Sequence, residues 1–364
     1  MAPNAHNFAP MPAAEEAAAG QLELLKREEA RLSEMLSSVR RQKLSVLRSR
    51  PLTIGVVGFG RFGQFISRKF SKYGNVVGTS RSNYTDVAAE MGARYIPLEN
   101  LDEFVSSDLD VIVVAVSIVS FEDTIRDLVP HLQRMIETTG SCPLIVDVLS
   151  VKDHARKILL DNLPIECDVL CTHPMFGPDS AKHSWKGTNF VYERTRVDKV
   201  LLDASKDRTF HHQLSQSDAD SDNEFVDETG TVHDVHEGSE AHVAGMDRME
   251  RFLSIWEEEG CNMISMSCKS HDEYTASSQF ITHLVGRVLG EQGLEATPID
   301  TKGFQSVLRL IETTTADSFD LFYGLYKYNQ NSKDIIVKLK ESLGDVVNKL
   351  VEKEGSDSEL KSCL

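Results

Sequence analysis

Short apolar runs alternate with amphipathic stretches between residues 52 and 192. The runs are rich in Val and Ile, as buried strands are: Leu52–Val57, Asn75–Thr79, Val111–Val116, Leu144–Val148, Val169–Thr172 and Asn189–Tyr192. Between them lie helical patterns such as Phe62–Lys72 and Phe121–Thr138. Strands that alternate with helices form a mostly parallel sheet covered on both faces. The pattern therefore predicts an α/β fold with a Rossmann-type doubly wound sheet.

The pattern becomes almost wholly helical toward the C-terminus. A helix over Met246–Glu259 and a strand over Asn262–Ser267 come first. Three long helical segments follow, which are Asp272–Gln292, Gly303–Lys327 and Ser332–Glu354. We expect a dinucleotide-binding domain over residues 51–268, and a helical substrate-binding domain over residues 269–364 that forms a homodimer by burying its apolar faces.

Residues 1–50 form a separate N-terminal region. Residues 1–14 are rich in Ala and Pro, and we expect them to be disordered. From Glu15 to Leu47 apolar residues recur at helical spacing, and Pro51 ends the helix. This amphipathic helix could form a short coiled coil or lie on the body of the protein. The opening stretch has neither an apolar signal core nor the Arg residues of a transit peptide, so we expect a cytoplasmic location.

Residues 203–245 interrupt the sheet pattern with an acidic segment. Eleven acids lie between Asp203 and Glu240 against two bases, Lys206 and Arg208, so the segment contributes −9 of the net charge of −17. It has no apolar period, which predicts a disordered, solvated insertion. Its five histidines lack the spacing of metal ligands, and no metal site is predicted.

Charge and composition exclude several classes of protein. A net charge of −17 disfavours nucleic acid as a partner. No apolar run approaches the roughly 18 residues that would cross a membrane. The six cysteines include no Cys-x-x-Cys pair, so we expect ordinary reduced thiols. A cytosolic enzyme is the class that these features favour.

A dinucleotide-binding fingerprint follows the first predicted strand. Gly58-Phe59-Gly60-Arg61-Phe62-Gly63 fits the pattern G-x-G-x-x-G between an apolar strand and a helix. Gly58 permits the tight turn, Gly60 lets the backbone approach the pyrophosphate, and Gly63 lets the helix and the strand pack closely. The pyrophosphate would lie on the N–H groups at the N-terminus of the helix.

The end of the second predicted strand indicates which dinucleotide binds. An NAD site places an acid about 20 residues after the glycines, whereas this chain has Ser80 and Arg81 there and no acid until Asp86. Ser80 and Arg81 would bind a 2′-phosphate, with Arg61 as a second cation, so NADP is predicted. Alternatively, Arg81 is a solvated charge and the enzyme takes either cofactor. Ser117 is a further candidate contact to the cofactor.

Two histidine-containing segments carry candidate chemistry. His173 stands at the end of a predicted strand, where ligands bind in open α/β sheets, and Pro174 favours an extended geometry that would project the His173 ring. His271 and His283 are twelve residues apart. On a single helix their rings would be displaced by about 120° and could not both face one site squarely.

At these residues the sequence resembles the arogenate/prephenate dehydrogenase family, most closely its plant-like branch. The resemblance covers roughly residues 52–195 and 246–330. It rests on the glycine fingerprint and on further motifs in the same order: Asp147-Val148-Leu149-Ser150-Val151-Lys152, Thr172-His173-Pro174-Met175-Phe176-Gly177-Pro178, His271-Asp272 with Ser278-Gln279-Phe280-Ile281-Thr282-His283, and Ala316-Asp317-Ser318-Phe319-Asp320-Leu321.

The resemblance implies a role for each histidine. His173 would be the catalytic residue, drawing the proton from the ring hydroxyl of the substrate as hydride leaves for the nicotinamide and the ring carboxyl is lost as CO2. Ser150 matches a serine that orients this histidine. His283 matches a second, substrate-side histidine, with Gln279 one turn before it. His271 resembles a residue at the domain junction that is more structural than catalytic.

The chain departs from the family in ways that bear on the substrate. Bacterial members carry an Arg in the third C-terminal helix that anchors the ring carboxylate, and the matching stretch Ile311-Glu312-Thr313-Thr314 has none. Arg309, about one turn earlier, could reach the same place or be a surface charge, and Lys182 and Lys302 are weaker candidates. His183 lies near where family members choose between substrates, so arogenate and prephenate both stay open.

Two other functions compete with this one. A β-hydroxyacid or 6-phosphogluconate-type dehydrogenase would need a catalytic Lys near the start of the interdomain helix, where this chain has His271-Asp272 with Lys269 two residues earlier. A non-catalytic NADPH-binding regulator should have lost His173 or Ser150, and both are present. The expected function is therefore an NADP-dependent arogenate or prephenate dehydrogenase.

Overall fold

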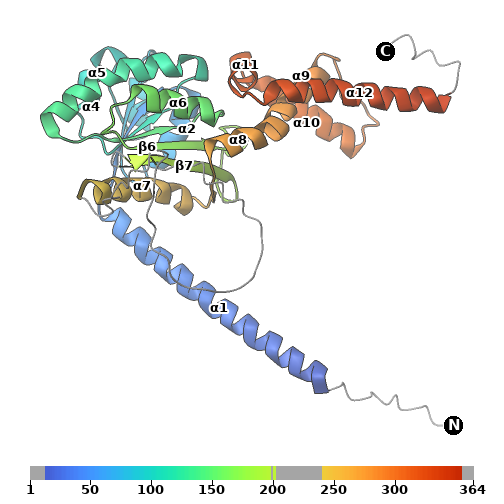
Figure 1. Ribbon diagram of the computed structural model, residues 1–364, viewed down its shortest axis with the longest axis horizontal. Coiled ribbons are helices and arrows are strands. Elements are labelled where there is room, and N and C mark those ends of the chain that lie inside the picture. The colour runs from blue at the N-terminus through green and yellow to red at the C-terminus, as the bar shows by residue number, and fades with distance from the viewer. Residues whose placement is uncertain (1–12, 198–199, 202–239, 355–364) are drawn as a thin grey trace, which may run out of the picture. The chain divides into compact units, whose positions relative to one another are not determined.

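The computed structural model describes residues 13–197, 200–201 and 240–354 (Figure 1). The chain divides into two units, Met1–Pro51 and Leu52–Leu364. The first unit contains one long helix, α1 (Ala13–Arg48), as the apolar spacing predicts. Its large apolar side chains between residues 22 and 39 are more than half exposed.

The second unit is built on a nine-stranded sheet of order β3-β2-β1-β4-β5-β6-β7-β8, with β9 beside β7. The strands are β1 (Thr53–Val57), β2 (Asn75–Thr79), β3 (Arg94–Tyr95), β4 (Val111–Val114), β5 (Leu144–Asp147), β6 (Val169–Pro174), β7 (Asn189–Val197), β8 (Val200–Leu201) and β9 (Asn262–Ser265). Strands β1 to β6 pair in parallel, and β7 runs antiparallel to β6. The doubly wound, Rossmann-type sheet is confirmed.

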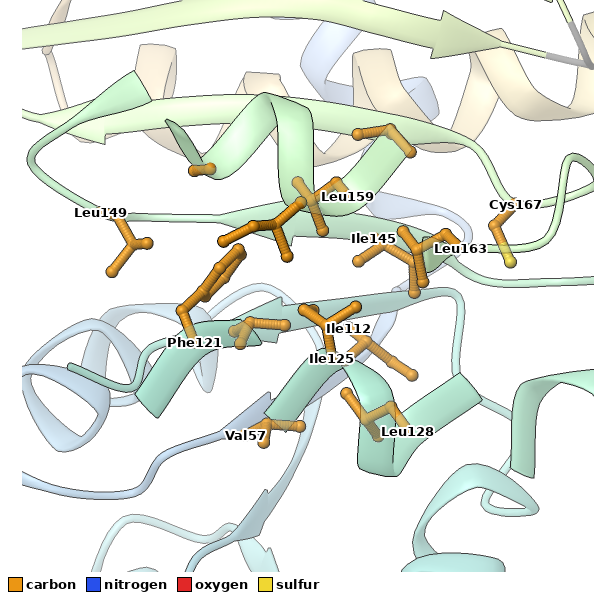
Figure 2. Close-up of a cluster of buried hydrophobic side chains, with 14 of the residues drawn as sticks. Val57, Ile112, Phe121, Ile125, Leu128, Ile145, Leu149, Leu159, Leu163 and Cys167 are labelled. Carbon is orange, nitrogen blue, oxygen red and sulfur yellow. The ribbon is translucent and has the colours of Figure 1, made fainter. Parts of the chain in front are cut away.

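Helices cover both faces of this sheet and create two apolar cores. One face is covered by α2 (Arg61–Phe70) and α7 (Glu240–Glu258), whose Phe70 and Phe252 rings pack with centroids 5.6 Å apart. The opposite face carries α5 (Phe121–Thr139) and α6 (Lys152–Asn162). Figure 2 shows strand residues such as Ile112 facing Ile125 of α5 in this core. Each such buried side chain contributes about 1.5–3 kcal/mol.

Shorter helices complete the sheet region, and longer ones form the C-terminal region. The first group is α3 (Thr85–Glu90), α4 (Leu101–Val105) and the 3-10 turns Leu98–Asn100 and Ile118–Ser120. The second group is α8 (Cys268–Thr275), a π-helical turn (Ala276–Phe280), α9 (Ile281–Gly290), α10 (Lys302–Ala316), α11 (Phe319–Tyr328) and α12 (Ser332–Glu354).

Two predicted helices differ from the structure. The predicted helix Asp272–Gln292 contains the π-helical turn, so its residues do not follow one regular spacing. The predicted helix Gly303–Lys327 is two helices, because Asp317 adopts an extended backbone (ψ 146°) and the Ser318 side chain caps α11 by accepting a hydrogen bond from the Leu321 N–H.

The predicted acidic insertion over residues 203–245 falls mostly outside the described residues, as do four of its five histidines (His211, His212, His233 and His236) and residues 1–12. Residues 240–245, however, form the first turns of α7, so the prediction of disorder is wrong for them. Among the described residues, no helix is long and apolar enough to cross a membrane.

The expectation of six reduced thiols is wrong for one pair. Cys142 and Cys167 form a disulfide with their Cα atoms 5.2 Å apart. These residues precede β5 and β6, which are adjacent parallel strands, so the sheet brings them together although the sequence separates them by 25 residues. Cys171, Cys261 and Cys268 are free and buried.

Candidate active site

The glycine turn between β1 and α2 has the form that a bound dinucleotide needs. Gly58 has φ 94°, and a Cβ there would lie 2.6 Å from the Ala115 carbonyl oxygen. A Cβ at Gly63 would lie 2.1 Å from the Gly58 carbonyl oxygen. Gly60 differs, because its φ is −75° and a Cβ would meet no protein atom within 4 Å. The backbone therefore requires two of the glycines, whereas Gly60 leaves open the space that a pyrophosphate would take.

A cavity of about 420 Å³ opens beside this turn, at the carboxyl ends of β1, β2 and β4. Its lining includes Gly58, Gly60, Ser80, Arg81 and Ser117. This is the switch point of the strand order, where open α/β sheets bind ligands. The side chain of Arg81 is exposed and makes no hydrogen bond or ion pair within the described residues, while the Ser80 hydroxyl donates to the Ser82 carbonyl (2.8 Å).

A second cavity, of about 650 Å³, lies between the carboxyl edge of the sheet and the C-terminal helices. It brings together four of the residues predicted for catalysis and substrate binding, Ser150, His173, Gln279 and His283. Ala115, Val116 and Ser117 line both cavities, so the two adjoin. A nicotinamide extending from the glycine turn would reach the side chains of the second cavity.

His173 belongs to a chain of hydrogen bonds that links β6 to α8. Its Nδ1 lies 2.8 Å from the Nε2 of His271, and the Nδ1 of His271 lies 2.8 Å from Oδ1 of Asp272. The two histidines are 4% and 1% exposed. The Asp272 carboxylate also accepts the backbone N–H groups of Lys152 and Asp153, at the first turn of α6. One buried carboxylate thus fixes the helix start and the histidine pair together.

This chain of bonds assigns the tautomer of each ring. Both carboxylate oxygens of Asp272 accept backbone N–H groups, so Asp272 is the acceptor toward His271 as well, and His271 donates from Nδ1 and accepts at Nε2. His173 must then donate from Nδ1, which leaves its Nε2 as an acceptor with no partner among the described residues. Burial, and next the electrostatic effects of the neighbouring His271 ring and the Lys152 ammonium, hold the pKa of His173 well below its ordinary value. The ring is therefore neutral near pH 7, as a proton acceptor must be.

A buried ion pair supports the strand that carries His173. The Lys152 ammonium pairs with the Asp147 carboxylate and also donates to the Thr172 carbonyl oxygen, and both side chains are almost fully buried. The Asp147 carboxylate accepts the Leu149 N–H as well (3.1 Å). Burial raises the pKa of Asp147, and the charge of Lys152 opposes this. The motif Asp147 to Lys152 therefore joins β5, α6 and β6 just beneath the larger cavity.

The side of the larger cavity that the π-helical turn and α9 form contains unpaired polar atoms. Gln279 lies in the π-helical turn and His283 one turn later in α9. The Oε1 atom of Gln279 and the Nδ1 atom of His283 are buried and have no hydrogen-bond partner in the part of the chain that the structure describes. Burial lowers the pKa of His283, and the nearby Asp317 carboxylate opposes the shift. Buried polar atoms without a partner are rare in folded proteins, which favours a bound ligand here.

Several predicted residues occupy other places. Ser150 lines the larger cavity but makes no hydrogen bond to His173 in the described structure, where His271 takes that position. Arg61 lines the larger cavity and pairs with Asp179, so it does not stand beside Ser80 as a second cation. Phe62 lines the larger cavity, whereas the Phe59 ring is buried in the core.

The candidate cations for the substrate carboxylate are not in the cavity. Arg309 is exposed on α10, whose Thr314 packs against Gly286 of α9 instead. Lys182, His183 and Lys302 are also exposed, and none of the four residues lines the larger cavity.

Sequence reasoning missed the contacts that three residues make. His271 was expected to be structural, yet it contacts His173 directly from 98 residues away in the sequence. Lys152 and Asp317 were noticed only inside motifs. A signal was present for His271, since an acid follows it and could orient its ring, but pairing with His173 required the topology.

A Rossmann-type sheet with a glycine turn beside a neutral, oriented histidine defines a dinucleotide-dependent oxidoreductase. Comparison with known proteins gives the family. A family model for the prephenate dehydrogenase nucleotide-binding domain matches residues 63–206, and one for a TYRAAT1-like C-terminal domain matches residues 288–362.

Two plant proteins are similar over most of the chain. "Arogenate dehydrogenase 2, chloroplastic" of Arabidopsis thaliana is 39% identical over 304 residues, covering 83% of this chain and 71% of the relative. "Arogenate dehydrogenase 1, chloroplastic" of the same plant is 40% identical over 289 residues, covering 78% of this chain and 37% of the relative. The chain belongs to the arogenate/prephenate dehydrogenase family, and is an oxidoreductase of tyrosine biosynthesis.

Solved structures agree on the fold. A prephenate dehydrogenase from A. aeolicus, in complex with hydroxyphenyl propionate and NAD+, superposes with a TM-score of 0.55 at 14% identity, over 86% of this chain and 95% of that one. The arogenate dehydrogenase of Synechocystis superposes with a TM-score of 0.51 at 15% identity, over 83% and 93%. At these identities the likeness concerns the fold alone.

Proposed function

We propose that this protein is an NADP-dependent dehydrogenase that converts arogenate to tyrosine, or prephenate to 4-hydroxyphenylpyruvate, by oxidative decarboxylation. The observation that carries the proposal is the neutral His173, whose Nε2 has no partner among the described residues, in a cavity adjoining the glycine turn. The other two-domain dehydrogenases would need a catalytic Lys near the start of α8. Lys269 is there, but it does not line the larger cavity.

The residues of the cavity account for the proton in this reaction. His173 Nε2 accepts the proton of the ring hydroxyl as the hydroxyl carbon becomes a carbonyl carbon. His271 and Asp272 hold the ring in the tautomer that can accept, and Asp272 stabilises the positive charge that forms. Once the carbonyl is present, it accepts the electron pair released as the ring carboxyl leaves as CO2, and the ring becomes aromatic. A bound nicotinamide would supply the acceptor for the hydride.

The choice of NADP rests on two residues. Ser80 and the unpaired Arg81 line the smaller cavity where the ribose 2′ position would lie, and a guanidinium suits a phosphate there. The same cavity contains two carboxylates from α5, Asp123 and Asp127, which would repel a phosphate placed near them. NAD is the alternative, and the A. aeolicus structure contains that cofactor.

We also propose that the protein forms a homodimer through its helical region and that the domain boundary lies near residue 268. The support is a set of large apolar side chains that α9 to α12 and their connections leave exposed: Val288, Leu294, Ile299, Phe319, Tyr323, Val337, Leu343, Val346 and Leu350. These side chains support the proposal, since exposed apolar surface that forms one patch is typical of protein interfaces. The cytoplasmic location stays a prediction, since both Arabidopsis relatives are chloroplastic by name.

The test is cofactor reduction by the purified full-length chain. Arogenate and prephenate are each incubated with NADP and with NAD, and the absorbance of the reduced cofactor is followed with the release of CO2. We expect reduction with NADP and at least one substrate, with one CO2 for each cofactor reduced. Reduction without CO2 release would point to another dehydrogenase, and no reduction in any of the four mixtures would refute the proposal.

A further inference from the structure

The N-terminal helix α1 has one apolar side, and that side is exposed. Six positions of the helix alternate at spacings of three and four residues, which is the seven-residue repeat of a coiled coil. We call these positions the seam: Leu22, Leu25, Glu29, Leu32, Leu36 and Val39. The five apolar side chains of the seam are all more than half exposed, from 51% at Leu36 to 61% at Leu25.

The side of α1 opposite the seam is polar and forms ion pairs within the helix. Arg27 donates to Glu23 (3.4 Å), and both side chains are exposed. A helix with two such different sides gains most of its stability from a partner that covers the apolar side. At 1.5 Å per residue, the 36 residues of α1 extend about 54 Å, or about five heptads. The exposed seam is therefore a surface for another helix.

The charge of α1 changes sign along its length, which indicates what the other helix is. In the sequence, residues 13–30 contain five acids and two bases, for a net charge of −3. Residues 31–48 contain five bases and one acid, for a net charge of +4. Two parallel copies of α1 would place halves of like charge side by side, whereas antiparallel copies place each acidic half beside a basic half. The helix is complementary to a second copy of itself that runs in the opposite direction.

Glu29 favours the same direction of pairing. It is the one polar residue of the seam, near its middle. In a parallel pair each seam residue meets its own equivalent, so the two Glu29 carboxylates would face each other in the packed interface. Bringing two like charges together away from water is unfavourable. An antiparallel pair places the two carboxylates at different levels of the interface.

The spacing of the seam also fits an antiparallel pair whose ends are aligned. In that register, residues that lie opposite each other have numbers that add up to 61, as the first and last residues of α1 do. Each seam residue then lies opposite another seam residue: Leu22 opposite the partner's Val39, Leu25 opposite the partner's Leu36, and Glu29 opposite the partner's Leu32. The pairing therefore uses the whole length of the helix, and Glu29 faces a leucine.

We propose that α1 is a self-association surface, whose seam pairs with the seam of a second copy of this chain in an antiparallel coiled coil of two helices. The same surface serves both partners, as a two-fold contact requires. The pairing involves residues of the first unit only, so it is distinct from the homodimer contact proposed for α9 to α12. It needs neither substrate nor cofactor, and it stands or falls independently of the proposed dehydrogenase activity.

Site-specific cross-linking of the full-length chain tests both the partner and the direction. Leu22→Cys and Val39→Cys are expressed separately and together, with different affinity tags, and each sample is mildly oxidised. In the antiparallel register two copies of position 22 are about 26 Å apart along the helix axis, which is too far for a disulfide. We expect a covalent dimer with one chain of each variant, in a yield about tenfold or more above that of either variant alone.

The matched control for cross-linking is Leu24→Cys expressed together with Val39→Cys. Leu24 is a leucine of the same helix that is 67% exposed and is turned about 100° away from Leu25. The wild type, oxidised in the same way, shows what the native cysteines contribute. Equal cross-linking in a single variant and in the mixture would indicate a parallel pair and overturn the proposal. It is also overturned if the mixture does not cross-link, or if the control cross-links equally well.

Hydrogen exchange tests the seam without introducing cysteines. Leu32→Glu places a charge in the seam, and Leu24→Glu is the same substitution outside it. We expect the amides of residues 20–42 to exchange about tenfold or more faster in Leu32→Glu than in the wild type, because burial of one leucine side chain is worth more than a tenfold change in an equilibrium constant. Leu24→Glu should exchange like the wild type. Unchanged exchange in Leu32→Glu, or equal acceleration in the two variants, contradicts the proposal.

Discussion

Replacing His271 by Leu removes the residue that sets the tautomer of His173. The side chain is 1% exposed and makes two hydrogen bonds of 2.8 Å, one to His173 and one to Asp272. Leu fills a similar volume but can neither donate nor accept. In the variant the Nδ1–H of His173 loses its acceptor, and the ring is free to carry its proton on Nε2, where it cannot act as a base.

The expected magnitudes follow from these contacts. A buried donor left without a partner costs about 1–3 kcal/mol, so the free energy of unfolding should fall by that amount. In a serine protease, loss of the group that fixes the histidine tautomer lowers kcat by about 10⁴-fold. Here His173 is also held by its own burial, so we expect a loss in kcat of about 10²-fold, with KM for the substrate and Kd for NADPH nearly unchanged.

The assay measures kcat and KM by cofactor reduction, Kd for NADPH by fluorescence titration, and unfolding by urea. His154→Leu is the control, because His154 is a half-buried histidine that stacks on Tyr328 (4.2 Å between ring centroids) and lies outside the cavity. It should keep the wild-type kcat. A His271→Leu protein that is destabilised but retains full kcat would show that His271 is structural only, and the tautomer argument would fail.

Three further predictions concern the cofactor and pH. Arg81→Ala should raise Kd for NADP by about 10-fold or more and leave NAD nearly unchanged; an equal effect on both would remove the 2′-phosphate role. Gly60→Ala should fold with the wild-type Tm yet bind NADP weakly. Gly63→Ala should lower the Tm, because a Cβ at position 63 meets the Gly58 carbonyl oxygen. Wild-type NADP affinity in Gly60→Ala would contradict the placement of the pyrophosphate. Because the pKa of His173 is lowered, kcat/KM should be level above about pH 6.5 and fall only in more acidic solution, and an acidic limb centred above that pH would refute a neutral, buried base.

Protein stability should depend on pH through the same groups. The pKa values of His173, His271 and His283 are lowered in the folded state, mainly by burial. The unfolded chain therefore binds more protons below about pH 6.5, and the free energy of unfolding should decrease as the pH falls from there toward the folded-state pKa values.

Local pattern was enough to predict the long strands of the sheet, whereas the two-residue strands β3 and β8 were missed. The strand Asn75–Thr79 and the helix Ser332–Glu354 have the predicted bounds, because an apolar run or a helical period is a property of neighbouring residues. The helix break at Asp317 and Ser318 was missed because apolar residues continue at helical spacing through it. The capping serine was the available signal, and a Ser before an apolar segment is a weak one unless the break is suspected.

Residues of the site could be predicted where a local motif determines their chemistry. They could not be predicted where segments far apart in the sequence must come together in the fold. The glycine turn, His173 and His283 follow from their local motifs. The contact between His173 and His271, and the disulfide Cys142–Cys167, join segments that meet only once β6 lies beside its neighbours and α8 packs on α6. Arg309 shows a related limit. It lies about one turn from the expected position in the sequence, yet its side chain on α10 does not line the larger cavity.

The most direct test of the account is the turnover of His173→Asn. Asn keeps a polar group near the position of the ring but cannot take a proton near neutral pH. With arogenate or prephenate and NADP, we expect kcat to fall by about 10²–10⁴-fold while Kd for NADPH stays within about twofold of the wild type. Retention of the wild-type kcat, or an equal loss of cofactor binding, would show that His173 is not the base of this reaction.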